Sequence, residues 1–457
     1  MEQSRHTTTG PGLSAGTLTS SARAGSRPVS MPKIALASFI GAMLEWYDFF
    51  LFGTASALIF APLFFPSTNK EIGTALSFAT FGVGFVARPL GGVFFGHMGD
   101  RLGRKVTLIL TMLIIGIGTF LIGLMPTYAS IGVWSPIGLI ILRLAQGFGL
   151  GGEYGGAALL TIEHAEPERR GFWGSLPQAS GAAGLLVGTG VFTLMTYLPK
   201  GQFMSWGWRV PFLLSVVMLV VGVFIRVSVL ETPEFEKTVR TQAVARLPFL
   251  ALLKQHPLNT VYATCARLIE CVVFNVIMVY GLNYVTHVVG VPQSVPLTGI
   301  IISSVVAIPL FPLLGLLADR WGRREIYIAG SVLAFLLAFP VFMLFNTGSS
   351  VAVVLAIVVM GGIVTSVLYS VETTFFSEIF HANVRYTGLS VAYQFSAIIG
   401  GFVPLVFVGR SEWLVAGFLA FVAVVSGVCA YLAIDVRGQQ EPGADMVWAK
   451  SASSLVT

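Results

Sequence analysis

Residues 96–105 of the chain read GHMGDRLGRK, and residues 315–324 read GLLADRWGRR. Both stretches follow the pattern Gly-x-x-x-Asp-Arg-x-Gly-Arg-Arg/Lys, and their aspartates lie 219 residues apart. Each stretch joins two long apolar runs, where glycine permits a tight turn and the basic residues can anchor a loop on an anionic membrane surface. A turn that recurs once per half predicts a duplicated membrane protein, with each copy on a cytoplasmic loop.

The composition supports a membrane protein. The 457 residues are 55% hydrophobic and 11% charged, with a mean hydropathy of +0.83. Soluble domains contain about 25% charged residues, so a soluble fold could not bury this much apolar surface. The net charge of +6 does not indicate a nucleic-acid partner, because the basic residues are dispersed among short loops without a basic-aromatic patch.

Apolar stretches long enough to cross a bilayer, about 20 residues each, recur along the whole chain. They predict an all-α integral membrane fold of twelve transmembrane helices, arranged as two pseudo-symmetric six-helix bundles. The predicted helices cover residues 34–62, 73–97, 106–126, 135–163, 172–198, 209–230, 257–288, 296–318, 325–346, 350–379, 386–409 and 411–434.

This pattern divides the chain into two bundles, 34–230 and 257–435, joined by a cytoplasmic linker at 231–256. Residues 1–33 lack the apolar core of a signal peptide, so we expect a disordered cytoplasmic tail there. A second cytoplasmic tail covers residues 436–457. Most of the 27 Lys and Arg residues fall in loops on one side, which predicts that both termini are cytoplasmic.

A second repeat accompanies the first. Glu163 and Arg170 are seven residues apart after the fourth span, and Glu378 and Arg385 are seven apart after the tenth. We expect these loops to form conformational gates, because an ion pair can close in one state and open in another. The alternative is that they only anchor the topology. The gate candidates are Asp100, Arg101, Arg104, Asp319, Arg320, Arg323, Glu163, Arg170, Glu378 and Arg385.

Carboxylates inside predicted spans are costly and are therefore candidates for coupling transport to protons. Glu45 and Asp48 lie three residues apart in the first span, on one helix face. Two close carboxylates do not both ionise easily, which suits a reversible proton carrier. An internal salt bridge is the alternative. The full set of proton-coupling candidates is Glu45, Asp48, Glu153, Glu270 and Glu372.

Arginines inside spans need an anion, because guanidinium stays charged. Arg88 is expected either to bind substrate or to pair with Asp48 or Glu45. Arg267 and Glu270 are spaced for a local pair, and Glu372 is a second expected partner of Arg267. The substrate-binding candidates are Arg88, Arg143, Arg267, Tyr47, Gln178, Asn275, Tyr369 and Gln394. The uncharged members of this set could instead be interhelical hydrogen-bonding residues.

The chain resembles the metabolite:H⁺ symporters of the major facilitator superfamily, which include shikimate, α-ketoglutarate, citrate and proline/betaine transporters. Within that family it is most similar to the shikimate-transporting members. The first half carries the resemblance most closely, so the turn at Asp100 is expected to be the main conformational latch. The matching stretches are Glu45–Phe49, Gly84–Gly92, Gly96–Lys105, Arg143–Gly156, Glu168–Gly171, Trp206–Phe212, Leu317–Arg324 and Arg385–Gly388.

The resemblance implies a symporter that imports a small organic acid or zwitterion across the plasma (bacterial inner) membrane by alternating access. The expected coupling ion is the proton, with no cofactor, no metal and no enzymatic activity, and a monomer would suffice. A proton-antiport exporter of organic compounds is the main alternative. A non-transporting sensor is a further one, although neither the linker nor the tails are long enough for an output domain.

Overall fold

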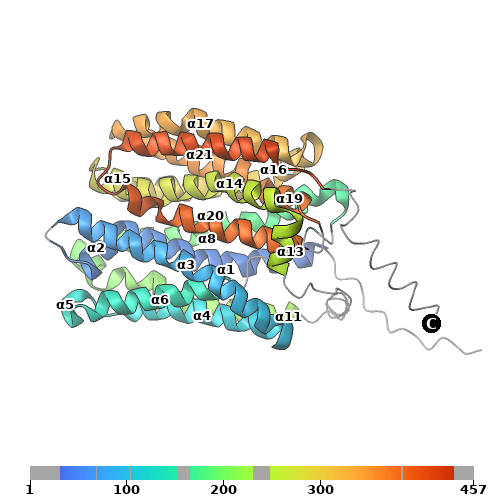
Figure 1. The fold of residues 1–457 in the computed structure, drawn as a ribbon. Coiled ribbons are helices and arrows are strands. Elements are labelled where there is room, and N and C mark those ends of the chain that lie inside the picture. The colour runs from blue at the N-terminus through green and yellow to red at the C-terminus, as the bar shows by residue number, and fades with distance from the viewer. Residues whose placement is uncertain are drawn as a thin grey trace, which may run out of the picture.

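The computed structural model describes residues 31–67, 69–102, 104–151, 162, 165–229, 248–381 and 384–436. All regular secondary structure within these ranges is helical. In Figure 1 the helices run side by side, with the first half of the chain (blue to green) below the second half (yellow to red). The all-helical prediction is confirmed over the described residues.

The first half contains twelve short or long helical segments within the described ranges. They are α1 (Met31–Leu58), α2 (Phe60–Phe64), α3 (Lys70–Leu102), α4 (Arg104–Leu124), α5 (Tyr128–Ile131), α6 (Trp134–Gly151), η1 (Pro167–Arg169), α8 (Arg170–Thr196), α9 (Lys200–Gln202), η2 (Phe203–Gly207) and α10 (Arg209–Leu213), followed by α11 (Ser215–Val229).

The second half begins with a short helix, α13, and ends with α21. Its segments are α13 (Pro248–Gln255), α14 (Pro257–Phe274), η3 (Asn275–Gly281), α15 (Leu282–His287), α16 (Ser294–Trp321), α17 (Arg323–Asn346), α18 (Ser350–Ile357), η4 (Val358–Val364), α19 (Thr365–Glu378), α20 (Arg385–Phe407) and α21 (Glu412–Leu432).

Nine helical segments of the described part of the chain are long and apolar enough to cross a membrane. They coincide with nine of the twelve predicted spans, including all six of the second half. The other three predictions fall on α1, α4 and α6, of which α6 is described only to Gly151. The end of the predicted linker is helical, because residues 248–255 form α13. Residues 231–247 of that linker lie outside the described ranges.

The two halves meet along two seams. At one seam α8 packs against α16, and at the other α3 packs against α20. Within the first half, α8 also packs on α1 and α3 packs on α6. Outward-facing apolar side chains such as Leu90, Val93 and Phe224 are exposed, as expected where lipid rather than water surrounds the helices. The seams therefore bring residues of both halves together at the centre of the molecule.

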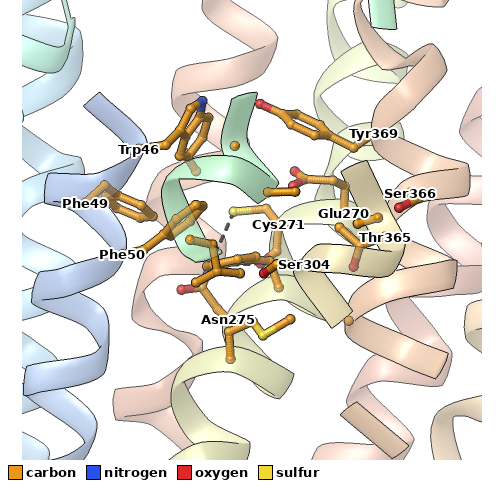
Figure 2. A pocket seen from close by; sticks show the side chains of 18 of the residues that line it. Trp46, Phe49, Phe50, Glu270, Cys271, Asn275, Ser304, Thr365, Ser366 and Tyr369 are labelled. Atoms are coloured by element: carbon orange, nitrogen blue, oxygen red, sulfur yellow. Dashed lines mark hydrogen bonds between the residues drawn. The ribbon is translucent and has the colours of Figure 1, made fainter. Parts of the chain in front are cut away.

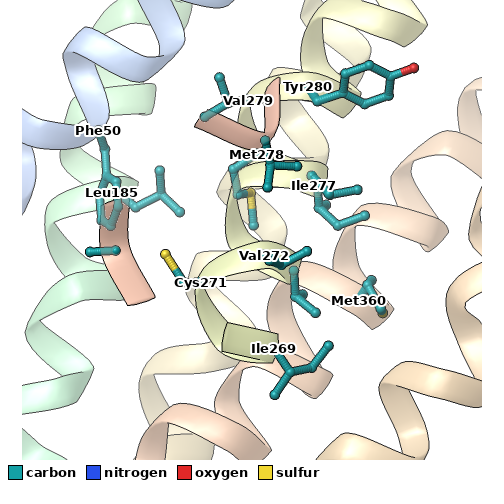
Figure 3. Close-up of a cluster of buried hydrophobic side chains, with 14 of the residues drawn as sticks. Phe50, Leu185, Ile269, Cys271, Val272, Ile277, Met278, Val279, Tyr280 and Met360 are labelled. Atoms are coloured by element: carbon teal, nitrogen blue, oxygen red, sulfur yellow. The ribbon is translucent and has the colours of Figure 1, made fainter. Parts of the chain in front are cut away.

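The buried core runs continuously through the centre and includes side chains of both halves. Figure 3 shows Phe50 and Leu185 of the first half facing Cys271 and Met278 of the second. Two spans of the second half change to π-helical winding in this region, at η3 and η4. A π-helical stretch shifts the side chains that follow it around the helix axis and often occurs at functional sites.

Candidate functional site

A cavity lies between the halves, and the space in it that no atom occupies measures about 690 Å³ when the part open to solvent is included. Its first-half wall comes from α1, α3 and α8, and its second-half wall comes from α14, η3, α16, η4, α19 and α20. Figure 2 shows the aromatic side chains of α1 on one side and polar side chains of α14 and α19 on the other. The aromatic residues of the lining are Trp46, Phe49, Phe50, Phe85, Phe274, Phe311, Tyr369 and Tyr393.

Arg88 is the cation of the first-half wall. Its side chain is only 4% exposed, and its guanidinium carbon lies 4.9 Å from the centre of the Phe49 ring and 4.4 Å from that of Phe85. Its Nε has no hydrogen-bond partner, and no described carboxylate forms an ion pair with it. The expected pairing with Asp48 is absent, and the side chain of Glu45 lies outside the described residues.

Arg267 presents the opposite situation in the second-half wall. Its Nε donates to Oε1 of Glu372 at 2.8 Å, and its Nη2 lies 3.2 Å from Oε2 of Glu270. Its Nη1 donates to the hydroxyl of Ser396 at 2.7 Å, and the guanidinium lies over the ring of Tyr393. Both pairs expected from the sequence are therefore present, and a single cation is held between two carboxylates.

Arg143 is buried beside the cavity rather than in its lining. It lies on α6 with 2% of its surface exposed. Its guanidinium carbon is 4.2 Å from the centre of the Phe52 ring, and it donates to the carbonyl of Phe81 and to Oε1 of Gln146, both at 3.4 Å. Arg143 therefore packs inside the first bundle.

Asp48 is also buried without reaching the cavity lining. Its Oδ1 has no hydrogen-bond partner, and the carboxyl group lies against Thr119 of α4. The neighbouring Tyr47 donates its hydroxyl to the carbonyl of Pro211 at 2.6 Å, within the first bundle. Tyr47 and Asp48 therefore face the interior of the first bundle, whereas the aromatic residues beside them on α1 line the cavity.

The remaining uncharged candidates divide into two groups. Asn275 and Tyr369 line the cavity. Gln178 instead bonds Thr373 across the seam between α8 and α19, and Gln394 lies on α20 outside the lining. The sequence thus identified part of the lining and, in Gln178, one interhelical contact.

The side chains of six charged candidates lie outside the described part of the structure. Glu153 and Glu163 lie outside the described residues, as do the side chains of Glu45, Asp100, Arg101 and Arg104. The gate candidates that remain are those of the second half and Arg170.

The second copy of the repeated turn joins the two halves. Asp319 at the end of α16 accepts hydrogen bonds from the backbone N–H groups of Gly171, at 2.7 Å, and Phe172, at 3.0 Å. Both residues lie in the first turn of α8, where unpaired N–H groups attract a negative charge. Arg323 pairs with both Asp319 and Glu378. The turn at Asp100 was expected to be the main latch, but its side chain is outside the described residues. Among the described residues, Asp319 is the aspartate that bridges the halves.

The other gate candidates with described side chains are Arg170, Arg320 and Arg385. Arg320 is exposed, and Arg385 donates to the carbonyl of Phe380 at 3.4 Å. The close approach beneath Asp319 depends on glycine, because a Cβ on Gly171 would lie 2.5 Å from the carbonyl oxygen of Gly315.

Several lining residues were missed by the sequence reasoning. They are hydroxyl pairs in apolar spans, Ser303 with Ser304 on α16 and Thr365 with Ser366 on α19. Adjacent polar residues in an otherwise apolar span are a signal that could have found them. The π-helical stretches have no comparable sequence signal, because their winding depends on the packing of neighbouring helices.

Comparison with known proteins identifies the family. A profile described as "Major Facilitator Superfamily" matches residues 34–404. The chain is 41% identical to the shikimate transporter of Escherichia coli (strain K12) over 379 residues, which cover 82% of this chain and 86% of that protein. It is 32% identical over 393 residues to the proline/betaine transporter of Salmonella typhimurium, covering 84% and 77%. All of these relatives are membrane transporters and none is an enzyme.

Solved structures confirm the fold. The xylose transporter XylE from E. coli, in a partially occluded inward-open conformation, superposes with a TM-score of 0.71 at 15% sequence identity. The match covers 90% of this chain and 99% of the other. The predicted two-bundle membrane fold and the predicted family are therefore both confirmed.

Proposed function

Since this chain belongs to the Major Facilitator Superfamily and is a secondary transporter, we propose that it imports a small organic acid or zwitterion together with a proton. The curated relatives carry small metabolites, as the names of the shikimate and proline/betaine transporters state. The proposed site is the cavity between the halves, with Arg88 as the group that receives the substrate carboxylate. A monomer is the proposed working unit.

The charge balance around the cavity carries the proposal. Arg88 and Arg267 contribute two positive charges, and Glu270 and Glu372 contribute two negative charges when ionised. A bound monocarboxylate adds one negative charge to a site closed off from water. Net charge inside a membrane costs about 2.5–3.5 kcal/mol per group even on permissive scales. Binding one proton with the substrate removes that charge.

The proposed proton acceptor belongs to the carboxylates around Arg267. Arg267 neutralises one of its two partners, which leaves the other carboxylate to balance Arg88 across the cavity. When a substrate carboxylate binds Arg88, it takes over that balancing role. Glu372 is favoured as the carboxylate that then accepts the proton, because its ion pair uses Oε1 and its Oε2 has no hydrogen-bond partner. In Glu270, by contrast, Oε2 is the atom that lies 3.2 Å from Arg267.

The proposed orientation follows the positive-inside rule and puts both termini in the cytoplasm. Asp319 then lies on the cytoplasmic side, where its contact with α8 closes the cavity. On the opposite side Asn283 donates to the carbonyl of Ala57 at 2.8 Å. Alternating access would require these two contacts to break in turn.

Uptake into proteoliposomes tests the proposal. The purified protein is reconstituted, an inward proton gradient is imposed, and a panel of radiolabelled organic acids and betaines is offered. We expect accumulation that stops when a protonophore collapses the gradient. Uptake that is indifferent to the gradient would rule out symport, and proton-driven loss from preloaded vesicles would favour export instead.

A Glu372→Gln variant separates coupling from binding. The amide resembles a permanently protonated carboxyl, so this variant should still exchange substrate across the membrane at equal concentrations. It should no longer accumulate substrate against a gradient. Full accumulation by this variant would assign the proton to another carboxylate, with Asp48 the next to be tested.

A further inference from the structure

An amide group joins the two halves on the outer side of the molecule, opposite Asp319. Asn283 of α15 donates through its Nδ2 to the carbonyl of Ala57 on α1 at 2.8 Å. The same Nδ2 lies 3.2 Å from Nδ1 of His287, one turn further along α15. We call the contact between Asn283 and Ala57 the outer gate. Its donor nitrogen is thus shared with a histidine ring.

The number of protons on His287 decides whether this arrangement can exist. An amide nitrogen carries two N–H donors and accepts no hydrogen bond, so Nδ1 of His287 is the acceptor and the ring is neutral, with its proton on Nε2. A second proton would convert Nδ1 into a donor. Two donors would then face each other, so the amide of Asn283 would have to turn, and its bond to Ala57 would weaken.

A second charge makes the protonation of His287 act between the halves. Lys70, at the start of α3 in the first half, is the charged residue that acts electrostatically on the His287 ring. A protonated ring would place two positive charges, one from each half, close together, and like charges repel. Protonation therefore weakens the contact between the halves in two ways that act in the same direction.

Few other ionisable groups surround this end of α15. The helical segments that make most of its contacts are α1, η3 and α16, and neither α1 nor α16 has an ionisable residue within its two outer turns. On η3, Tyr280 stacks on Tyr284 of α15. Glu412 of α21 lies near Tyr284, and Glu71 of α3 lies against Gly409. No described carboxylate forms an ion pair with His287, so its positive charge would not be neutralised.

We propose that His287 is a proton-sensitive positioning residue of the outer gate and acts through Asn283, an inference that rests on the proposed orientation and alternating-access cycle. Neutral His287 accepts from Asn283 and holds the outer gate closed. Protonated His287 turns the amide away, repels Lys70 and favours the state that is open to the outside. Histidine ordinarily changes its charge between about pH 5 and pH 8, and the exposed side chain of His287 can take its proton from the outer solution.

This proton differs from the one proposed to travel with the substrate. His287 is not part of the cavity lining and lies at the outer end of its span, so its proton binds and leaves on the same side of the membrane. Acid on the outside would raise the fraction of molecules that are ready to receive substrate. The carboxylates around Arg267 remain the proposed coupling groups.

Distance measurements on the purified full-length protein test the inference. Spin labels are attached at the outer ends of the two bundles through Val133→Cys, before α6, and Val351→Cys, on α18, which are both exposed. The native cysteines that are replaced by alanine are Cys265, Cys271 and Cys429. Double electron–electron resonance without substrate then compares pH 7.5 with pH 5.5.

We expect the fraction of molecules with the longer label distance to rise about two- to ten-fold at pH 5.5, the range of one hydrogen bond. A distance distribution that is the same at both pH values would overturn the inference.

Variants of two histidines locate the response. His287→Gln keeps a hydrogen-bond acceptor for Asn283 and does not titrate, so it should show the shorter distance at both pH values. His256→Gln is the matched control, because His256 directly precedes the same span at its opposite end, and it should keep the full response. A full response in His287→Gln would show that another group senses the pH.

Two further variants separate the hydrogen bond from the charge. Asn283→Ala removes the bond to Ala57, so it should show the longer distance already at pH 7.5. Lys70→Gln removes the repulsion and should reduce the rise at pH 5.5 without abolishing it. A wild-type distribution in Asn283→Ala at both pH values would contradict the action of His287 through the amide, and an unchanged rise in Lys70→Gln would exclude the charge from the mechanism.

Uptake measurements keep this inference distinct from the proposed function. If His287→Gln abolishes the pH response of the distance but wild-type uptake ignores a proton gradient, the pH-sensitive outer gate stands and symport is wrong. If wild-type protein accumulates substrate with protons but His287→Gln keeps the pH response of the distance, symport stands and the role of His287 is wrong.

Discussion

At the scale of single residues, the two cavity arginines differ in how their charge is balanced. Arg267 has two carboxylate partners and a serine hydroxyl. Arg88 has aromatic faces instead, and a desolvated cation–π contact contributes about 2 kcal/mol. Taking an ion out of water costs several kcal/mol. Arg88 therefore gains most from an anion that arrives with the substrate.

Replacing Arg88 should remove this interaction. We expect Arg88→Gln to weaken carboxylate binding by roughly 10- to 150-fold, because a hydrogen bond to a charged group contributes about 1.5–3 kcal/mol. Arg88→Lys should retain part of the affinity, since it keeps the charge and loses the planar fork. Calorimetric titration provides the measurement, with Arg410→Gln as an exposed control. Unchanged affinity in Arg88→Gln would remove this residue from the site.

At the scale of helices, the position of Arg88 depends on the crossing of α3 and α6. A Cβ on Gly151 of α6 would lie 1.9 Å from the carbonyl oxygen of Arg88. No real Cβ contact is this short, so the two backbones would have to separate. Glycine allows two helix backbones to approach closely, and at this position the approach is made to the residue that carries the cavity charge.

A glycine pair tests this crossing. Gly151→Ala should lower the Tm and weaken substrate binding, because α3 must move together with Arg88. Gly190→Ala on α8 is the matched control, since a Cβ there meets nothing within 4 Å. It should leave binding unchanged and stabilise the helix by up to about 1 kcal/mol. Thermal unfolding and titration of both variants measure the difference, and equal behaviour would contradict the role of Gly151.

A second helix-scale prediction concerns the histidine pair at the start of α14. Nδ1 of His381 lies 2.6 Å from Nε2 of His256, and both side chains are buried. Burial and the neighbouring His381 lower the pKa of His256 below 6.5. The folded state therefore binds its proton less readily than the unfolded chain, so stability is fully present above pH 6.5 and falls as the pH drops through the lowered pKa.

We accordingly expect the Tm to fall between pH 7.5 and pH 5.5. His256→Gln should reduce this fall, because glutamine can still bond His381 and does not titrate. The measurement compares the Tm difference between the two pH values in wild type and variant. An identical difference would show that the pair does not contribute to the pH dependence.

At the scale of the whole molecule, Asp319 links the two bundles through the N-terminus of α8. In the proposed alternating-access cycle, this contact is present in the state that is closed on that side and absent from the state that is open there. Asp319→Asn should weaken it and populate the state that is open there, because the amide carries no charge to interact with the helix end.

The native thiol of Cys271, which lines the cavity, can report this opening. In a background where Cys265 and Cys429 are replaced by alanine, a membrane-impermeant maleimide added on the Asp319 side should label Cys271 several-fold faster in Asp319→Asn. Glu166→Gln, an exposed change near the same end of α8, is the control. Equal labelling rates in all three proteins would show that Asp319 does not hold the cavity closed.

Several elements were predictable because hydrophobicity along the chain reports directly on a membrane environment. The spans of the second half and the pairing of Arg267 with Glu270 followed from local spacing. The pairing with Glu372 also followed, since a buried cation requires an anion. The positions of Arg143 and Tyr47 outside the cavity could not be predicted from the sequence. Whether a residue faces the cavity depends on how its helix is rotated relative to its neighbours.

By itself, therefore, the sequence determined the membrane fold, its duplication, its family and the identity of the buried charges. These properties depend on composition and short-range pattern, which a chain carries before it folds. Only the tertiary structure decided that Arg88 has no ion pair with any described carboxylate, that Arg143 packs inside the first bundle, and that the Asp319 turn bridges the halves. These depend on which atoms of distant helices come within hydrogen-bonding distance, and that is settled by packing.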